Sequence, residues 1–429
     1  MLDGGLVLLG LLLVMLAGMP IAFALGAIGY AGIWWLRSFN AANTVTVNQI
    51  FDLAQTHTFT VLPLFILMGN LIARARISHD LYAASNAFMG HFRGGLAMAT
   101  IAACAGFSAV SGSSMATAST MSRVAMGPMR KLGYSDALAA GSITAGGTLG
   151  ILIPPSVILL IYGILTSTNI GQLFIAGVVP GLLAVIGYML AIAVVTRINP
   201  AAGPAGPRTA WPERMRLVRG VWPIIVLFAL VLGGIYLGVF TPTEAAGIGA
   251  FGACVFVVAR RRVTLTGFID ILIESARTSA MMIALLFGAT LFNNFLDMLG
   301  FARGLAAWLD AANLTPMTAL LMMMMVYLVL GLFLESLSMM LLTIPIFFPI
   351  VQALGIDPVW FGILVVVVIE ISLITPPVGM NVFILKIMVK NITLATIFRG
   401  IMPFFIVDLV RLGILLAFPA VVLFLPRMM

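Results

Sequence analysis

The chain has 429 residues, of which 62% are hydrophobic and 8% charged, and its mean hydropathy is +1.18. This composition excludes a soluble globular domain and is typical of a polytopic helical membrane protein. The net charge of +8 is first explained by the enrichment of Lys and Arg on the cytoplasmic side of membrane proteins, so it does not indicate nucleic acid as a partner.

Apolar stretches long enough to cross a membrane as helices follow one another along the chain. They exclude an outer-membrane barrel, whose strands alternate over about ten residues. More polar segments at 74–93 and 264–277 alternate charged with apolar residues, and we expect amphipathic helices at the membrane surface there. The predicted apolar runs cover residues 4–18, 20–36, 58–73, 97–122, 137–166, 171–196, 221–240, 243–259, 276–299, 316–350, 359–390 and 401–425.

The chain divides into two halves that repeat. A loop rich in Pro, Gly and Arg at 199–220 separates residues 1–198 from 221–429 and is expected to be a cytoplasmic linker. Landmarks recur at a nearly constant spacing of 222 or 223 positions, which indicates an internal duplication: Pro20 and Pro242, Gly133 and Gly355, Pro154 and Pro376, Pro180 and Pro403. A topology with inverted halves places all Lys and Arg on the cytoplasmic side except Arg37, Arg303, Arg411 and Arg427.

Each half is predicted to contain a re-entrant hairpin and a broken helix. In the first half a hairpin at 97–125, expected to open from the cytoplasm, precedes a broken helix at 133–166. In the second half a hairpin at 316–345, expected to open from outside, precedes a broken helix at 357–390. Lipid cannot satisfy an interrupted backbone, so paired interruptions in two halves point to a transporter's binding site at membrane depth.

The residues at these interruptions suit ions. Helix ends inside the membrane expose N–H groups that favour anions and carbonyl groups that favour cations. Each half therefore offers a candidate sodium cage, and a negatively charged substrate could lie between the two hairpin tips. The first-half candidates are Ser111, Gly112, Ser113, Ser114, Gly146, Gly147, Thr148, Pro154 and Pro155; the second-half candidates are Gly331, Glu335, Ser336, Ser338, Thr375, Pro376, Pro377, Gly379, Met380 and Asn381.

Four charged residues in apolar segments need an explanation. A carboxylate in an apolar hairpin is costly, which makes Glu335 a functional candidate. Glu370 precedes the second break and either packs between helices or supports the site. Asp408 and Arg411 stand three positions apart in the last apolar run, so we expect them to pair on one helix face in a structural or subunit-contact role.

The whole chain is similar to the large membrane subunit of tripartite ATP-independent periplasmic (TRAP) transporters. The motifs that carry the resemblance are GMPIAFALG, GFSAVSGSS, LGILIPPS, TPTEAA, LESLSMMLLTIPIFFP and ITPPVGMN. The resemblance implies an all-α, inverted-repeat ion-transporter fold working as an elevator in the bacterial inner membrane. It also implies sodium-driven uptake of a small organic acid delivered by a periplasmic substrate-binding protein. A small four-helix membrane subunit is implied as a separate chain, and no cofactor is expected beyond sodium as the coupling ion.

The resemblance also assigns roles to residues. It implies sodium ligands at Ser111, Ser113, Ser114, Gly146 and Thr148 in the first half, and at Gly331, Glu335, Thr375, Gly379 and Met380 in the second. The substrate region would comprise Ser113, Ser114, Ser336, Ser338, both double prolines and Asn381. The hairpin acid is Asp in many members of the family and Glu335 here. The sialic-acid and C4-dicarboxylate branches both stay open.

Two other functions stay open as alternatives. A proton-coupled organic-anion transporter would use Glu335 and Glu370, two carboxylates near the second break. An intramembrane hydrolase would use a hydroxyl in the SGSS sequence, although the neighbouring segments supply no His or Lys base. A primary pump is not expected, because the chain has no nucleotide-binding P-loop motif.

Overall fold

The computed structural model describes residues 2–75, 77–260, 263–301, 303–305, 307 and 315–429, and over these ranges it is built from helices without a strand. This agrees with the all-α membrane fold expected from composition. Six of the described helices are long and apolar enough to cross a membrane: Ile170–Ile198, Trp211–Tyr236, Pro242–Ala259, Leu265–Leu299, Ser336–Ala353 and Leu394–Ala417.

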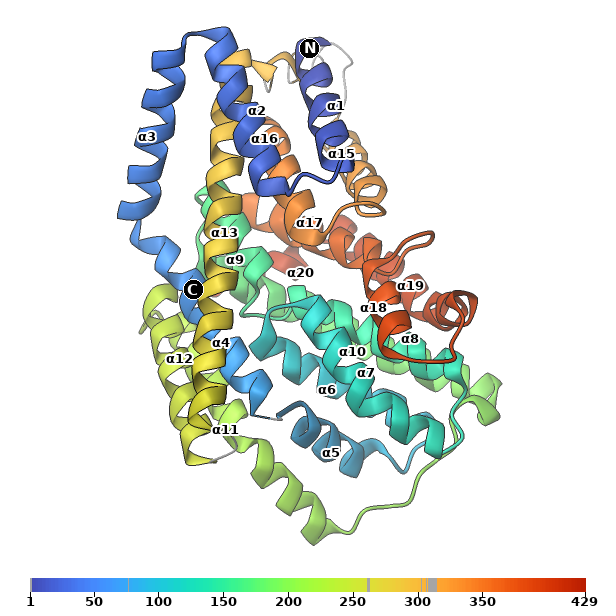
Figure 1. The fold of residues 1–429 in the computed structure, drawn as a ribbon. Helices are drawn as coiled ribbons and strands as arrows, with labels where there is room; N and C mark the ends of the chain where they lie inside the picture. The colour runs from blue at the N-terminus through green and yellow to red at the C-terminus, as the bar shows by residue number, and fades with distance from the viewer. Residues whose placement is uncertain (1, 76, 261–262, 302, 306, 308–314) are drawn as a thin grey trace.

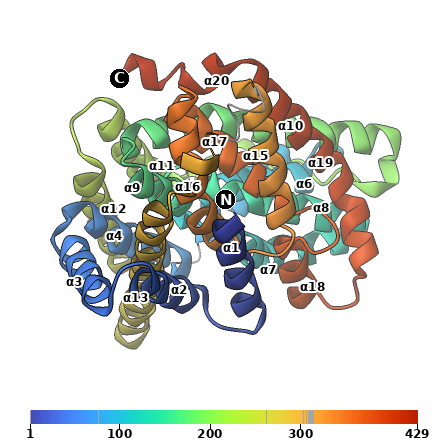
Figure 2. The same ribbon diagram turned by 90° about the horizontal axis from the view of Figure 1, so that it is seen from above.

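One side of the molecule is a column of helices around α13 (Figures 1 and 2). α13 packs against α2 and α4, and α12 packs against α4 and α11. The close approach of α2 to α13 depends on glycine, because a Cβ on Gly29 would lie 2.7 Å from the backbone nitrogen of Phe292. The column and its neighbours comprise α1 (Leu2–Leu16), α2 (Ile21–Leu36), α3 (Phe39–Gln55), η1 (His57–Thr60), α4 (Val61–Arg74), α11 (Trp211–Tyr236), α12 (Pro242–Ala259) and α13 (Leu265–Leu299).

The other side is a body in which the two halves interlock. α8 packs against both α7 of its own half and α19 of the other half, and α10 packs against α19. First-half members are α5 (Ile77–Met89), α6 (Gly95–Ser111), α7 (Ser114–Lys131), α8 (Asp136–Thr148), η2 (Leu149–Ile151), α9 (Val157–Thr166), α10 (Ile170–Ile198) and η3 (Pro200–Ala202). Second-half members are α15 (Pro316–Leu330), α16 (Ser336–Ala353), α17 (Pro358–Ser372), α18 (Met380–Met388), α19 (Leu394–Ala417), α20 (Pro419–Leu423) and η4 (Pro426–Met428).

Three helices differ from the pattern-based expectation. Residues 265–277 are not a separate surface helix but the first turns of α13, which continues unbroken to Leu299. Residues 211–220, placed in the linker, are the first turns of α11. α3 lies between two predicted apolar runs, and its Asn and Thr content hid it from a search for apolar segments. In each case helical hydrogen bonding continues through residues that are too polar to be recognised by hydropathy.

Side-chain caps fix where the helices of the body begin. Ser135 accepts a hydrogen bond from the backbone N–H of Leu138 at the start of α8. Asp357 accepts from the N–H groups of Val359 and Trp360 at the start of α17. Such caps satisfy N–H groups that have no partner within the helix, which matters most where water is scarce.

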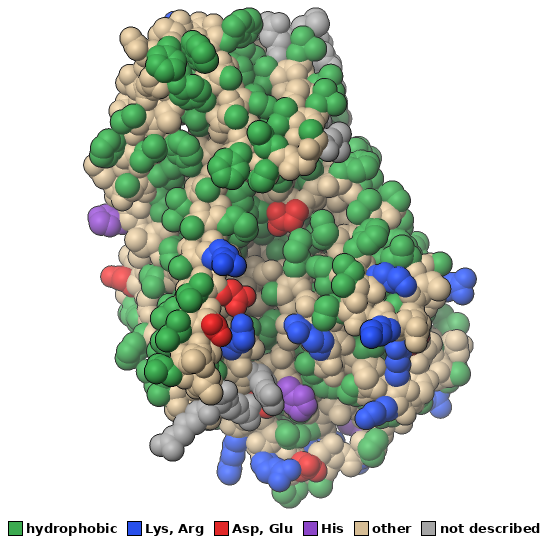
Figure 3. Space-filling model, in the orientation of Figure 1, with side chains coloured by type: hydrophobic (Ala, Val, Ile, Leu, Met, Phe, Trp, Pro, Cys, Tyr) green, Lys and Arg blue, Asp and Glu red, His purple; other side chains and the backbone are tan. Residues whose placement is uncertain are grey.

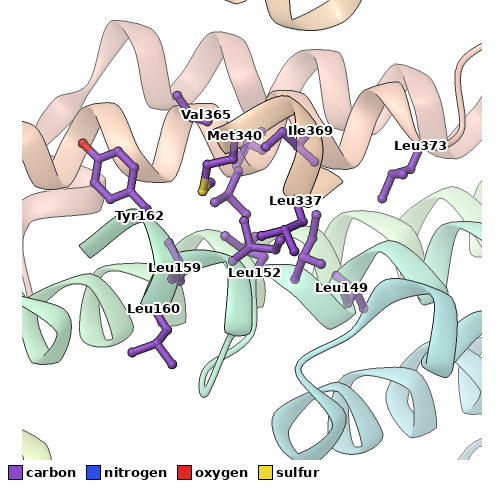
Figure 4. Close-up of a cluster of buried hydrophobic side chains, with 14 of the residues drawn as sticks. Leu149, Leu152, Leu159, Leu160, Tyr162, Leu337, Met340, Val365, Ile369 and Leu373 are labelled. Carbon is purple, nitrogen blue, oxygen red and sulfur yellow. The ribbon is translucent and has the colours of Figure 1, made fainter. Parts of the chain in front are cut away.

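A buried apolar cluster joins the two halves at the centre of the body (Figure 4). Leu149 and Leu152 from the first break lie with Leu337 of α16 and Ile369 of α17, and all four are buried. The space between the first break and the second hairpin is thus filled by hydrocarbon.

Candidate cation and substrate site at the two helix breaks

The first hairpin turns within two residues. α6 ends at Ser111, Gly112 adopts a left-handed conformation (φ +58°) and donates its N–H to the carbonyl of Ser108, and Ser113 caps α7. The hydroxyls of Ser111 and Thr117 lie 2.9 Å apart, and the Thr117 hydroxyl donates to the Ser113 carbonyl at 2.9 Å. The tip therefore gathers hydroxyl and carbonyl oxygens, the ligands that hard cations prefer.

This tip lies directly against the first helix break. A Cβ on Gly112 would be 3.0 Å from the carbonyl oxygen of Pro155, and one on Gly150 would be 2.5 Å from the carbonyl oxygen of Ser113. The Pro154–Pro155 peptide is cis, both prolines are buried, and Ser156 caps α9. Glycine at both contact points lets the two interrupted backbones touch.

The first tip also contacts the second half of the chain. The side-chain amide of Asn381, at the start of α18, donates to the Ser114 hydroxyl at 2.7 Å and accepts from it at 3.0 Å. The same amide approaches the Thr144 carbonyl in α8 at 3.5 Å. Ser114 and Asn381 are both buried, so this contact brings together predicted site residues that are 267 positions apart in the sequence.

The second hairpin turns over a longer segment. α15 ends at Leu330, and α16 begins after Glu335, whose carboxylate accepts a hydrogen bond from the Ser338 hydroxyl at 3.3 Å. Glu335 is half-buried, whereas Ser336 and Ser338 are buried. Gly331 abuts the hydroxyl of Ser372 so closely that a side chain would collide with it. The hairpin is thus held against the last residue of α17.

The second break is more open than the first. Between α17 and α18 the Pro376–Pro377 peptide is cis and both prolines are exposed, unlike their buried counterparts. Thr375 donates its hydroxyl to the Ile371 carbonyl at 2.6 Å. Gly379 has φ +59°, and a Cβ there would lie 3.3 Å from the carbonyl oxygens of both Leu373 and Thr375. The carbonyl groups of Leu373 and Thr375 thus lie close to Gly379, directly before Met380, the first residue of α18.

Not all predicted ligands face the hairpin tips. The Thr148 hydroxyl donates to Ala145 and lies 3.4 Å from the hydroxyl of Tyr188 in α10, so it is turned away from the first tip. Gly146 faces α6, where a Cβ would meet the sulfur of Cys104 at 2.7 Å, and Gly147 faces Ala118 of α7. For these three residues only backbone groups remain to act as ligands.

Several further groups contribute to the site without a signal of their own in the sequence motifs. The Thr144 carbonyl, the Thr117 hydroxyl and Ser372 all take part in the contacts around the breaks. The internal repeat could have identified Ser372. It lies 222 positions after Gly150, and each of these two residues contacts the hairpin of its own half.

A family model, "Tripartite ATP-independent periplasmic transporter, DctM component", matches residues 8–421. The chain belongs to this family. Two curated relatives agree with the assignment. The C4-dicarboxylate TRAP transporter large permease DctM of Pseudomonas aeruginosa is 39% identical, with 88% of each chain covered. The sialic acid TRAP transporter large permease SiaM of Vibrio cholerae is 31% identical over 98% of this chain and 97% of its own.

A solved structure supports the fold of this TRAP permease. The YdaH transporter of Alcanivorax borkumensis superposes with a TM-score of 0.65 at 16% identity, over 89% of each chain. The resemblance stated from motifs is therefore confirmed at the level of the family, which consists of transporter components.

A large cavity lies between the column and the body of the permease. Its volume is about 1320 Å³, and α4 and α13 line one side while α5 and α7 line the other. Charged side chains gather on the lower half of the face shown in Figure 3, whereas the upper half is mostly apolar. Arg74 and Glu274 pair at 3.5 Å within the cavity, and Arg123 of α7 approaches the Ser119 hydroxyl at 3.4 Å.

The charged residues of the last apolar run pair as expected and acquire a third member. Arg411 lies 3.0 Å from Asp408 and 2.7 Å from Glu370, and all three side chains are buried. Glu370 therefore packs against α19 through an ion pair and does not reach the second hairpin through any described hydrogen bond.

Proposed function

We propose that this TRAP large permease couples the inward movement of sodium ions to the import of a small organic acid anion. The observation that carries the proposal is the contact of Asn381 with the Ser114 hydroxyl and the Thr144 carbonyl, because it joins oxygen-bearing groups of both halves at the first hairpin tip. In transporters built from inverted repeats, interrupted helices supply carbonyls for sodium and N–H groups for an anion.

Two oxygen-rich sets fit the two proposed sodium sites. The first comprises the tip from Ser111 to Ser114 with the carbonyls that end α8, including those of Gly146 and Thr148. The second comprises Gly331, Glu335 and the carbonyls between Thr375 and Met380. The organic acid would lie beside Ser114, Ser336, Ser338 and Asn381, bordered by the two double prolines.

The electrical work of moving charge across the membrane favours the import of each anion together with more than one sodium ion. One elementary charge moving through 100 mV corresponds to about 2.3 kcal/mol. Two sodium ions entering with a monoanion would therefore leave one net charge driven by the membrane potential, in addition to both sodium gradients.

We further propose an elevator movement of the body against the column. Support comes from the cavity between them, which separates α7 of the first hairpin from α4 and α13. An organic acid delivered by a periplasmic binding protein would be carried with the body to the cytoplasmic side of the inner membrane. A small four-helix membrane subunit on a separate chain would complete the three-part system that the family description implies.

The test is uptake in proteoliposomes that contain the permease, its small partner and its binding protein, with sodium or potassium outside. The substrate is chosen by screening organic acids against the binding protein. We expect accumulation only with sodium and a strong loss in Ser114→Ala. Ser122→Ala is the matched control, because its buried hydroxyl on the same helix donates to the Ser119 carbonyl of its own helix and, among the described residues, contacts no group of the second half.

Equal uptake in potassium would overturn sodium coupling. The proton-coupled alternative would then be tested with a pH gradient and Glu335→Gln. Glu335 is the better candidate for a mobile proton in that case, because Glu370 is held by Arg411.

A further inference from the structure

Helices α10 and α19 meet at a buried polar network at the centre of the body. The Tyr188 hydroxyl contacts both carboxylate oxygens of Asp408, at 2.8 and 2.7 Å. One guanidinium nitrogen of Arg411, Nη2, lies 3.0 Å from Asp408 and donates to Glu370 at 2.7 Å. Tyr188, Asp408 and Glu370 have no exposed surface, and Arg411 is 3% exposed.

The ends of this network lie at the two helix breaks. At one end the Tyr188 hydroxyl lies 3.4 Å from that of Thr148, the last residue of α8. At the other end Glu370 stands two residues before Ser372, which ends α17 and contacts Gly331 of the second hairpin. Side-chain contacts therefore run from Thr148 at the first break to Glu370, and the backbone of the last turn of α17 connects Glu370 to Ser372 at the second break.

The network follows the internal repeat. Glu370 lies 222 positions after Thr148, and Arg411 lies 223 positions after Tyr188, which are the spacings of the proline landmarks. In the first half Tyr188 of α10 contacts the last residue of α8. In the second half Arg411 of α19 correspondingly contacts Glu370 in the last turn of α17. Asp408 departs from this symmetry, because its counterpart 223 positions earlier is Val185. Asp408 is the residue that contacts both Tyr188 and Arg411.

The contribution of this network to folding stability does not by itself explain its presence. Taking two carboxylates and a guanidinium out of water is expensive, and buried ion pairs are often replaceable by apolar residues without loss of stability. Moreover, Glu370 Oε1 and Arg411 Nε and Nη1 are buried without a hydrogen-bond partner among the described residues. The network therefore holds unused hydrogen-bonding capacity on both Arg411 and Glu370. Coupling between two sites requires an element with two discrete arrangements, and unused donors and acceptors favour such an element.

We propose that Tyr188, Asp408 and Arg411 are positioning residues that couple the two cation sites, so that a cation bound at one break strengthens binding at the other. This inference rests on the proposed sodium function. A cation held by the carbonyls that end α8 would fix Thr148, and Tyr188 and Asp408 would pass that constraint to Arg411 and Glu370. The end of α17 and its contact with Gly331 would then be set for the second cation.

The test measures how sodium concentration controls uptake in the assembled transporter. The variants are Asp408→Asn, which removes the charge at constant shape, and Tyr188→Phe, which removes one hydroxyl and keeps the ring packed 5.5 Å from that of Phe404. Tyr162→Phe is the matched control, because this buried tyrosine donates to the Pro358 carbonyl outside the network. Thermal unfolding in detergent with and without sodium gives a second readout.

For the unaltered transporter and Tyr162→Phe we expect a Hill coefficient for sodium above one. In both network variants it should fall toward one, and the half-saturating sodium concentration should rise by about tenfold, within the usual range of coupling between sites. Uptake at saturating sodium should persist.

An unchanged Hill coefficient in both variants would overturn the coupling. A Hill coefficient of one in the unaltered transporter would also overturn it, even if uptake depends on sodium. The latter result leaves sodium-driven import standing, whereas sodium-independent uptake refutes both proposals. Failure of both variants to fold would make the network a stability element and contradict its positioning role.

Discussion

Ser114 and Asn381 are hydrogen-bonded to each other across the two halves of the permease, at 2.7 Å from the Asn381 amide nitrogen to the Ser114 oxygen. Ser114 begins the second helix of the first hairpin, and Asn381 lies one residue after the start of the helix that follows the second break. This polar contact, together with the packing of α7 against α18, holds the hairpin of one half to the broken helix of the other. Any cation or anion bound at this tip must be accommodated by both halves.

Asn381→Leu tests this contact. The substitution removes the partner of the buried Ser114 hydroxyl, and an unsatisfied buried polar group costs about 1–3 kcal/mol. We expect a drop in unfolding temperature and at least a tenfold loss of uptake. Asn48→Leu, at an exposed position of α3, is the control. Uptake equal to that of the unaltered permease in Asn381→Leu would contradict a role for this contact.

Gly150→Ala tests the seating of the hairpin on the first break. The new methyl group would lie 2.5 Å from the Ser113 carbonyl oxygen and 2.8 Å from the Ser114 nitrogen, both backbone atoms that cannot move aside separately. We expect the tip to be displaced and sodium-dependent stabilisation to be lost. Gly127→Ala in α7 is the control, because its added Cβ would meet no atom within 4 Å among the described residues outside its own stretch of helix. Sodium stabilisation that survives in Gly150→Ala would show that the tip tolerates displacement.

Arg411→Leu tests the buried charge cluster. Removing the guanidinium leaves the carboxylates of Glu370 and Asp408 buried without a cation, and breaking a buried ion pair in this way costs about 3–5 kcal/mol. The exposed pair of Arg216 with Glu213 provides the comparison, and Arg216→Leu should cost less than about 1 kcal/mol. Unfolding of both variants in detergent measures the difference. Equal losses would mean that the cluster is not held by Arg411.

Arg123→Gln tests the large cavity as the path by which the organic acid leaves. Arg123 lines that cavity from α7, nine positions after Ser114, and a cation there would attract an anion released from the hairpin tip. We expect a several-fold slower uptake that depends less on ionic strength, with sodium affinity unchanged. Arg216→Gln, on the exposed start of α11, serves as the control for lost charge. An unaltered rate in Arg123→Gln would exclude this path.

The local features of the fold were readable from the sequence because they depend on neighbouring residues. Apolar length predicts the spanning helices, and the small sequence around Gly112 predicts a turn because glycine adopts the left-handed conformation found there. The double prolines at 154–155 and 376–377 each remove two consecutive backbone donors and so predict interruptions, whereas single prolines such as Pro180 and Pro403 lie inside continuous helices. The pairing of Asp408 with Arg411 followed from helical spacing alone.

Helix continuity was predicted less well. α13 runs from Leu265 through a charged first third, and α3 is polar enough to escape a hydropathy search. Both are helices because backbone hydrogen bonding and packing against the column continue through those residues, whatever their polarity.

Only the tertiary structure decided which groups meet. Ser114 finds Asn381, Thr148 turns to Tyr188, and Glu370 binds Arg411, although no local pattern connects the members of each pair. The first contact joins α7 to α18, and the other two arise where α8, α10, α17 and α19 pack together, in packing that depends on side chains distributed over both halves. The sequence by itself determined where the backbone must break. The association of the two halves decided which side chains lie next to each break, because the orientation of a side chain is fixed by the helices packed around it.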